Sequence, residues 1–192
     1  MDFISIDDII TISVTLFVII DVLGNVPVII KLKASMPNFK PGEITLFAGA
    51  LMIAFLFAGE SILKALGLDI NSFAIAGAIV IFLIALEMIL GVKIFKVDPD
   101  NTKSGNMVPI GFPLLAGAGT LTILISLRSI YSIMNILIAV GINLILIYVV
   151  LRSTGWIERK LSKSGLTAIE KFFGIITLAL AIKIIRTNFF PE

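Results

Sequence analysis

The sequence predicts an all-α membrane protein with six transmembrane helices, arranged as an inverted repeat of three plus three. Hydrophobic residues make up 58% of the 192 residues, and the mean hydropathy is +1.12, whereas a soluble domain has roughly 45 to 50% apolar residues. Six apolar stretches are each about as long as the roughly 20 residues that span a bilayer. A polar, helix-breaking motif interrupts the first of these stretches.

Short connections that contain Pro, Gly or Asp separate the apolar stretches. No stretch is polar enough or long enough for a soluble domain, so residues 1–192 are expected to form a single transmembrane domain. The first eight residues carry three Asp and no basic residue, which is unlike a cleavable signal peptide. The predicted spans are Ile9–Ile30, Ile44–Leu66, Ile70–Ile94, Val108–Leu127, Ile130–Leu151 and Thr167–Phe189.

The composition excludes several kinds of chemistry. The chain has no Cys and no His, which excludes disulfides, thiol catalysis and histidine-based metal sites. We therefore expect no cofactor and no metal. The net charge of +2 is small and the basic residues are scattered, so no nucleic-acid partner is expected. Carboxylates remain as the side chains that could titrate near neutral pH.

The polar motif in the first apolar stretch is the strongest candidate for a binding site. Residues 21–27 read DVLGNVP, so Asp21, Gly24, Asn25 and Pro27 fall within a segment that should be an uninterrupted helix. Asp21 lies roughly 14 Å inside the boundary marked by Lys31, near the middle of a bilayer core of about 30 Å. Broken backbone at that depth is tolerated where protein or a water-filled cavity covers it.

A structural explanation of the same motif stays open. Asp21 could cap the half-helix that follows the break, where a negative charge meets the positive end of the helix dipole. Asn25 could bond backbone groups that Pro27 leaves without partners. Both roles are compatible with binding a substrate.

The fourth apolar stretch contains a second motif, PLLAGAGT at residues 113–120. Its candidate binding residues are Gly117, Ala118, Gly119 and Thr120, because a run of small residues exposes backbone N–H groups that an anion could approach closely. The alternative is tight helix packing, for which membrane proteins commonly use small residues.

The spacing of glycines supports a duplicated unit. Gly24 and Gly77 are 53 residues apart, and Gly117 and Gly174 are 57 residues apart. We predict a first repeat at about residues 1–95 and a second at about 106–190, inserted upside down because three spans is an odd number. An inverted repeat with one broken helix in each half is typical of secondary transporters.

Two carboxylates are candidates for carrying a coupling proton. Asp21 is the first, because it is the acid nearest the expected midplane, and Glu87 near Lys93 is the second. The alternatives are that Asp21 stays ionised as a helix cap or a sodium ligand, and that Glu87 only reaches polar surroundings near Lys93.

Together the motifs resemble the MarC/SnatA family, of the UPF0056 type, whose six-helix members lie in the inner membrane. The family's first helix carries a motif like Asp-Pro-x-Gly-Asn-x-Pro, and its fourth reads like Pro-Leu-Leu-Ala-Gly-Pro-Gly. Residues 73–77 and 81–86 also look like its third helix. Here Val22 and Ala118 stand in place of the usual prolines, and Ala74 stands where many members carry Arg.

The resemblance implies a transporter of small neutral amino acids such as glycine and alanine, coupled to a proton or sodium gradient. A channel, or an exporter of another small solute, is the alternative; a channel would need charged or carbonyl rings around an oligomeric pore, so a homo-oligomer stays open. An intramembrane enzyme is disfavoured. A serine protease would need a Ser-His pair, and an aspartyl protease would need a second deep Asp beside Asp21.

Basic residues indicate which side of the cell membrane each connection faces. The connections between helices 1 and 2, 3 and 4, and 5 and 6 carry Lys31, Lys33, Lys40, Lys93, Lys96, Lys103, Arg152, Arg159, Lys160 and Lys163. The opposite side carries Lys64, Arg128, Lys183 and Arg186. Because short cytoplasmic loops are enriched in Lys and Arg, both termini are predicted to lie outside.

This topology predicts the labelling of cysteines introduced one at a time into a chain that has none. In intact cells, a cysteine at the position of Lys33, Lys96 or Lys160 should be protected from a membrane-impermeant thiol reagent, and one near either terminus should react. Labelling at position 96 from outside would contradict the predicted orientation.

Overall fold

The computed structural model describes residues 4–34, 36, 38–92, 110–160 and 162–189. These residues form eight helical segments and no strand, which confirms the all-α fold class. The segments are α1 (Ile6–Ile20), α2 (Val26–Ala34), α3 (Pro41–Ala65), α4 (Ile70–Leu90), a short π-helical turn η1 (Ile110–Leu115), α5 (Ala118–Arg128), α6 (Ile133–Lys160) and α7 (Lys163–Phe189).

Three of these helices, α3, α4 and α6, are long and apolar enough to cross a membrane, and they correspond to the second, third and fifth predicted spans. The first predicted span is divided between α1 and α2, the fourth between η1 and α5, and the sixth corresponds to α7. The count of six spans stays a prediction. Lys93, Lys96, Lys103 and Val108, on which parts of the predicted layout depend, lie outside the described residues.

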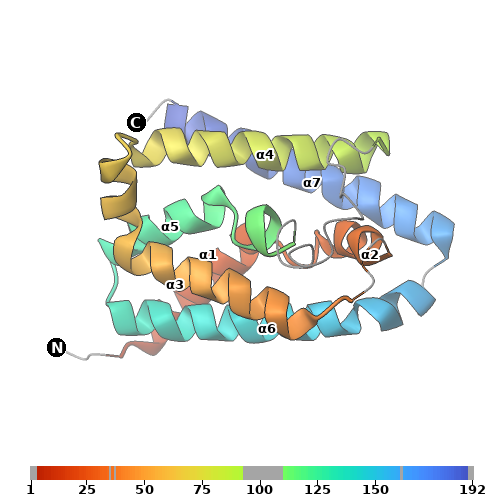
Figure 1. The fold of residues 1–192 in the computed structure, drawn as a ribbon, viewed down its shortest axis with the longest axis horizontal. Helices are drawn as coiled ribbons and strands as arrows, with labels where there is room; N and C mark the ends of the chain where they lie inside the picture. The colour runs from red at the N-terminus through yellow and green to blue at the C-terminus, as the bar shows by residue number, and fades with distance from the viewer. Residues whose placement is uncertain (1–3, 35, 37, 93–109, 161, 190–192) are drawn as a thin grey trace.

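The long helices run along the long axis of the molecule, and the interrupted elements lie between them (Figure 1). The first turn of α1 and the last turn of α7 lie at one end of this axis, whereas α4 and α6 end, and α7 begins, at the other. α1 runs from the first end toward the middle, and α5 runs from the middle back toward the same end. The two half-helices therefore run in opposite directions.

Helix packing follows the pattern that a two-fold repeat would require. α4 and α7 form the most extensive helix contact, α1 packs against α6, and α5 packs against α3. If the first three spans correspond to the last three, the contact of α2 with α6 is the counterpart of that of α5 with α3, and the contact of α1 with α6 is the counterpart of that of η1 with α3. The repeat itself stays a prediction.

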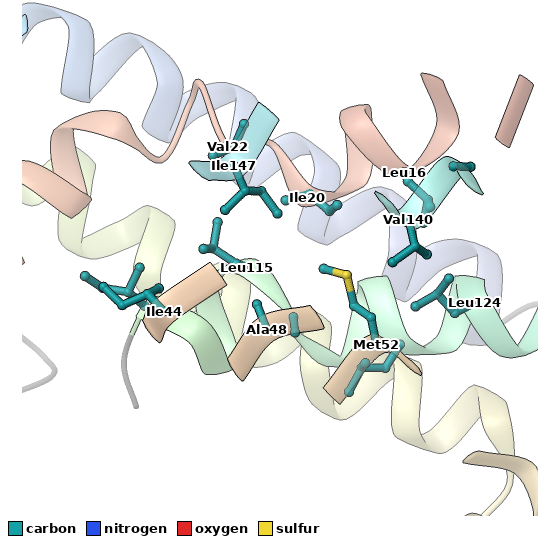
Figure 2. Packing of buried hydrophobic residues seen from close by; sticks show 14 of the residues in the cluster. Leu16, Ile20, Val22, Ile44, Ala48, Met52, Leu115, Leu124, Val140 and Ile147 are labelled. Carbon is teal, nitrogen blue, oxygen red and sulfur yellow. The ribbon is translucent and has the colours of Figure 1, made fainter. Parts of the chain in front are cut away.

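The core is a cluster of aliphatic side chains shared mainly by α1, α3, α5 and α6 (Figure 2). In α3 its members recur at every fourth position, with Ile44, Ala48, Met52 and Leu56 each at most 1% exposed, so one stripe of the helix faces inward.

Polar bridges hold α6 against α1. The Asn135 side-chain amide donates to Asp8 Oδ2 over 3.2 Å, and that of Asn143 donates to the Ser13 carbonyl over 3.2 Å. Both asparagines therefore bridge the two helices.

Gly77 allows α4 to pack closely against the start of α5. A Cβ atom added at Gly77 would lie 2.9 Å from Ala118 Cα and closer still to Ala118 Cβ, so no larger residue fits without moving a helix. This contact places α4 directly against the start of α5, at the second helix break.

Replacing Gly77 by Ala should therefore destabilise the fold, by about 1 to 3 kcal/mol for an overpacked site. Gly141 in α6 is the matched control, because a Cβ added there meets nothing within 4 Å. Gly141→Ala should be neutral or slightly stabilising, since Ala favours the helix by roughly 0.5 to 1 kcal/mol over Gly. Thermal unfolding of the two variants in detergent measures the difference, and equal shifts would contradict the close packing at Gly77.

Candidate functional site

The first helix breaks at Asp21, where the backbone turns into the left-handed conformation with φ 47° and ψ 44°. The Asp21 N–H still donates to the Phe17 carbonyl over 3.0 Å, so Asp21 ends α1 in the manner of a left-handed helix cap. Residues 21–25 are non-helical turns, and α2 begins at Val26.

Pro27 lies outside the unwound segment. It occupies the second position of α2, where a missing N–H costs little because the first N–H groups of a helix have no partner within it. Pro27 therefore helps to start the second half-helix, and the break itself falls ahead of it, at Asp21 to Asn25.

The Asp21 carboxylate lies at the junction of three segments. Oδ1 accepts the Gly24 N–H over 3.2 Å, and Oδ2 accepts the hydroxyl of Thr177 on α7 over 3.2 Å. A Cβ atom at Gly24 would lie 2.5 Å from Asp21 Oδ1, so this conformation of the carboxylate requires glycine. Asp21 thus accepts a backbone N–H from the turn that precedes α2 and also joins the break to α7.

Asn25 has the structural role that the sequence left open, and its role in binding stays a prediction. Its side-chain amide donates to the Ile20 carbonyl at the end of α1 over 3.2 Å, which satisfies a backbone group that the break exposes. The side chain is buried, with 4% exposed, and among the described residues its Oδ1 has no hydrogen-bond partner. A buried acceptor without a partner is costly, and because Oδ1 has almost no accessible surface, a ligand could reach it only after a local rearrangement.

The second break, between η1 and α5, has a similar side-chain bond. Phe112 within η1 has extended backbone, with φ −141° and ψ 131°, and Gly117 precedes the first turn of α5 with φ −72° and ψ 169°. The Thr120 hydroxyl donates to the Leu115 carbonyl over 3.2 Å. Asn25 and Thr120 thus each bond a carbonyl five residues back, at the end of the preceding helical segment.

A cavity of about 590 Å³ adjoins both breaks, between α1, α4, α5 and α7. Its lining residues are Val14, Thr15, Val18, Ile19, Ile20, Asp21, Asn25, Ala74, Ile81, Ile84, Leu114, Gly119, Thr122, Ile123, Ser126, Thr177, Leu180, Lys183, Ile184, Thr187 and Asn188. The volume falls within the range of small-molecule sites.

Three of the residues proposed from the sequence, Asp21, Asn25 and Gly119, line this cavity. The others do not line it: Gly24, Pro27, Gly117, Ala118, Thr120 and Glu87. Most of these shape the two breaks, whereas Glu87 lies near the end of α4, where its carbonyl accepts the Gly91 N–H.

Comparison with known proteins places this architecture in a family. The sequence pattern described as MarC family integral membrane protein matches residues 6–189. The chain belongs to the MarC family. It is therefore an integral membrane protein, and no solved structure matches it.

Several MarC relatives cover nearly the whole chain. The UPF0056 membrane protein YhcE of Escherichia coli is 30% identical over 188 residues, 90% of this chain and 87% of that protein. The UPF0056 inner membrane protein YhgN of Escherichia coli is 31% identical, with 91% and 92% covered, and a UPF0056 membrane protein of Methanocaldococcus jannaschii is 28% identical, with 89% and 90% covered. None of these names states an enzymatic activity or a transported solute.

The structure adds polar cavity residues of this MarC protein that sequence reasoning missed, notably Thr122, Thr177 and Lys183. Thr122 is buried, and its hydroxyl, like Asn25 Oδ1, has no partner among the described residues and almost no accessible surface. The sequence signal was weak: Thr177 follows Gly174 in the sixth apolar stretch, and only its contact with Asp21 shows its place in the site.

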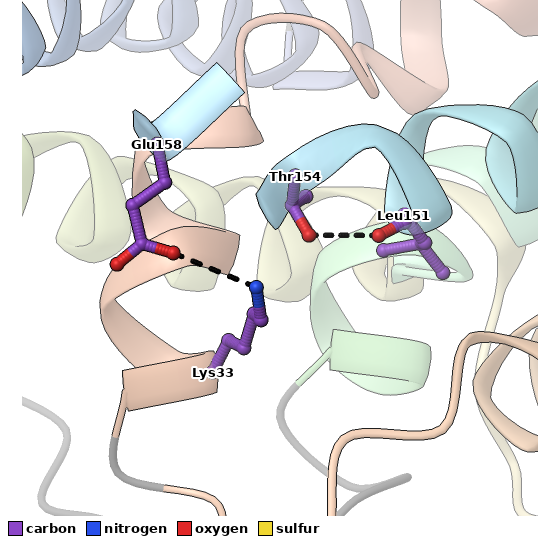
Figure 3. Close-up of polar contacts among 4 residues, drawn as sticks. All are labelled: Lys33, Leu151, Thr154 and Glu158. Carbon is purple, nitrogen blue, oxygen red and sulfur yellow. Dashed lines mark hydrogen bonds and ion pairs between the residues drawn. The ribbon is translucent and has the colours of Figure 1, made fainter. Parts of the chain in front are cut away.

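Beside the two breaks, away from the cavity, the side chains of this MarC protein are tightly packed. Val22, Leu115 and Ile147 lie together there and are each at most 2% exposed (Figure 2). Beyond them Lys33 Nζ lies 3.5 Å from Glu158 Oε2 and joins α2 to α6 (Figure 3). An exposed ion pair contributes at most about 1 kcal/mol, so the apolar packing is the main seal.

The lining of the cavity runs from the breaks along α1 and α7, toward the end of the molecule where α1 begins and α7 ends. Its exposed lining residues are Val14 and Val18 on α1 and Lys183 and Thr187 near the end of α7. Thr154 on the sealed side bonds the Leu151 carbonyl within α6 over 2.7 Å (Figure 3), so its hydroxyl is already satisfied there.

Proposed function

We propose that this MarC protein is a secondary transporter of small neutral amino acids, which bind in the cavity between the end of α1 and the start of α5. The observation that carries the proposal is the meeting of two opposite helix ends at one cavity. The alternative functions, a channel or an exporter of another solute, share the cavity but differ in how it is used.

The two helix ends suit the two charges of an amino acid. The C-terminal end of α1 carries partial negative charge and the N-terminal end of α5 carries partial positive charge, each equivalent to roughly half an elementary charge. Asp21 adds a carboxylate at the end of α1, where it favours an ammonium group. Gly119 in the first turn of α5 lines the cavity, and the N–H groups of that turn favour a carboxylate.

Close packing beside the breaks favours a carrier over a channel. A channel needs a continuous path, whereas Val22, Leu115 and Ile147 belong to the packed core and do not line the cavity. A carrier exposes its site to one side at a time, by movement of its repeats around a central site. We take this arrangement to be one of the two states of such a cycle.

Asp21 is the best placed group to couple substrate to an ion. It lines the cavity, and its bonds to Gly24 and Thr177 connect the first break with α7. Binding of an ammonium group near Asp21 would be linked to release of a proton, and the linkage is reciprocal. Glu87 does not line the cavity, which makes it the weaker candidate. Sodium held by Asp21 is the alternative coupling ion.

Asp21→Asn should separate coupling from binding. The purified variant in liposomes should lose accumulation of glycine or alanine driven by a proton gradient, because the amide keeps the shape of the side chain but cannot carry the proton. Exchange of substrate across the membrane should persist.

Glu60→Gln is the matched control, since Glu60 is exposed and bonds Lys64 at 2.6 Å on the surface of α3; it should behave as the parent protein. Accumulation that still follows an imposed pH gradient in Asp21→Asn would show that the proton travels elsewhere. Absence of any amino-acid uptake by the parent protein would remove the proposed function.

A further inference from the structure

We infer that the cavity contains an aliphatic subsite, formed by Ile81, Ile84, Ile123, Leu180 and Ile184, which binds the side chains of neutral amino acids larger than alanine. The inference rests on the proposed function, since it assumes that the charged end of an amino acid binds at the two helix breaks. It changes the expected substrate class from the smallest amino acids to those with aliphatic side chains.

The size of the cavity is the first support. A volume of about 590 Å³ equals the share of liquid occupied by roughly 20 water molecules, at about 30 Å³ each. Glycine or alanine bound at the breaks would leave most of this space to water. Much of the remaining wall is aliphatic, so that water would lie against apolar surface, which is unfavourable.

The order of residues along α7 sets the direction of a bound side chain. Thr177, which bonds Asp21 over 3.2 Å, Leu180 and Ile184 all line the cavity. Ile184 is seven residues beyond Thr177, or roughly 10 Å along the helix, and Leu180 lies between them. A side chain that starts near Asp21 therefore extends past Leu180 toward Ile184.

Gly119 on the opposite wall leaves room for a single methyl group beneath the isoleucine tips. A Cβ atom added there would lie 3.4 Å from Ile184 Cδ1 and 3.6 Å from Ile81 Cδ1, which is ordinary van der Waals distance. The tips of two isoleucines from α4 and α7 thus converge above a position of α5 that carries no side chain. Ile84 and Ile123 extend the same apolar wall.

The subsite predicts how affinity changes with side-chain length. Each methylene transferred from water to an apolar wall strengthens binding about fourfold, which corresponds to about 0.8 kcal/mol. Along the unbranched series glycine, alanine, 2-aminobutyrate, norvaline and norleucine, the affinity should rise with each step until the wall at Ile184 is reached.

The experiment measures the affinity of the full-length protein for each member of the series, by the thermal stabilisation that the ligand gives in detergent and by competition with labelled alanine in liposomes. A rise of at least tenfold from alanine to norvaline is expected. Binding of glycine and alanine with equal or weaker binding of norvaline would overturn the subsite and leave the proposed function standing. Failure of every member to bind would overturn both.

Two variants test whether the named wall is responsible. Ile184→Ala should reduce the gain in affinity from alanine to norvaline by about fourfold or more, because it removes apolar contact at the far end of the subsite. Ile182→Ala is the matched control on the same helix, since Ile182 is 50% exposed and does not line the cavity; it should keep the gain of the parent protein. Equal gains in the two variants would contradict the assignment of Ile184.

Discussion

The structure depends on one constraint: backbone groups freed inside an apolar protein must find partners nearby. Two interrupted helices meet in the middle of the molecule, and each supplies its own side chain for this purpose. Asn25 bonds the Ile20 carbonyl and Thr120 bonds the Leu115 carbonyl, each five residues back. Asp21 takes the Gly24 N–H in addition. These bonds satisfy backbone groups at the two breaks without help from a third segment. The end of α1 and the start of α5 can therefore adjoin a cavity.

Packing of the surrounding helices turns the two breaks into a site. Thr177 brings α7 to the first break through Asp21, and Gly77 brings α4 to the second through its close approach to Ala118. The same two helices pack along each other and, together with α1, supply most of the aliphatic wall. Polar groups at the breaks and apolar groups along α4 and α7 thus give the cavity two chemically different regions.

The sequence predicted the helical class and the positions of both breaks, because Asp, Gly, Asn and Pro within an apolar run act through local chemistry. It placed Pro27 in the unwound segment, whereas Pro27 begins α2, since a helix tolerates proline in its first turn. Thr122 and Thr177 could not be assigned from sequence, because threonine occurs throughout such helices and only tertiary contact with the cavity or with Asp21 distinguishes these two. The aliphatic wall is equally invisible in a chain of which more than half is hydrophobic.

The central claim is that the cavity at the two breaks opens to one side of the membrane at a time. Thr122 lines the cavity, and Val22 is buried in the packed core beside the first break. Each is replaced by Cys in a separate variant. The decisive measurement is the reaction of each with an impermeant thiol reagent added to either side of liposomes of known protein orientation, with and without amino acid. Thr122→Cys should react from the side on which α1 begins, and Val22→Cys should react only from the opposite side and only when substrate and gradient drive the cycle. Simultaneous reaction of both positions from one side would contradict the claim.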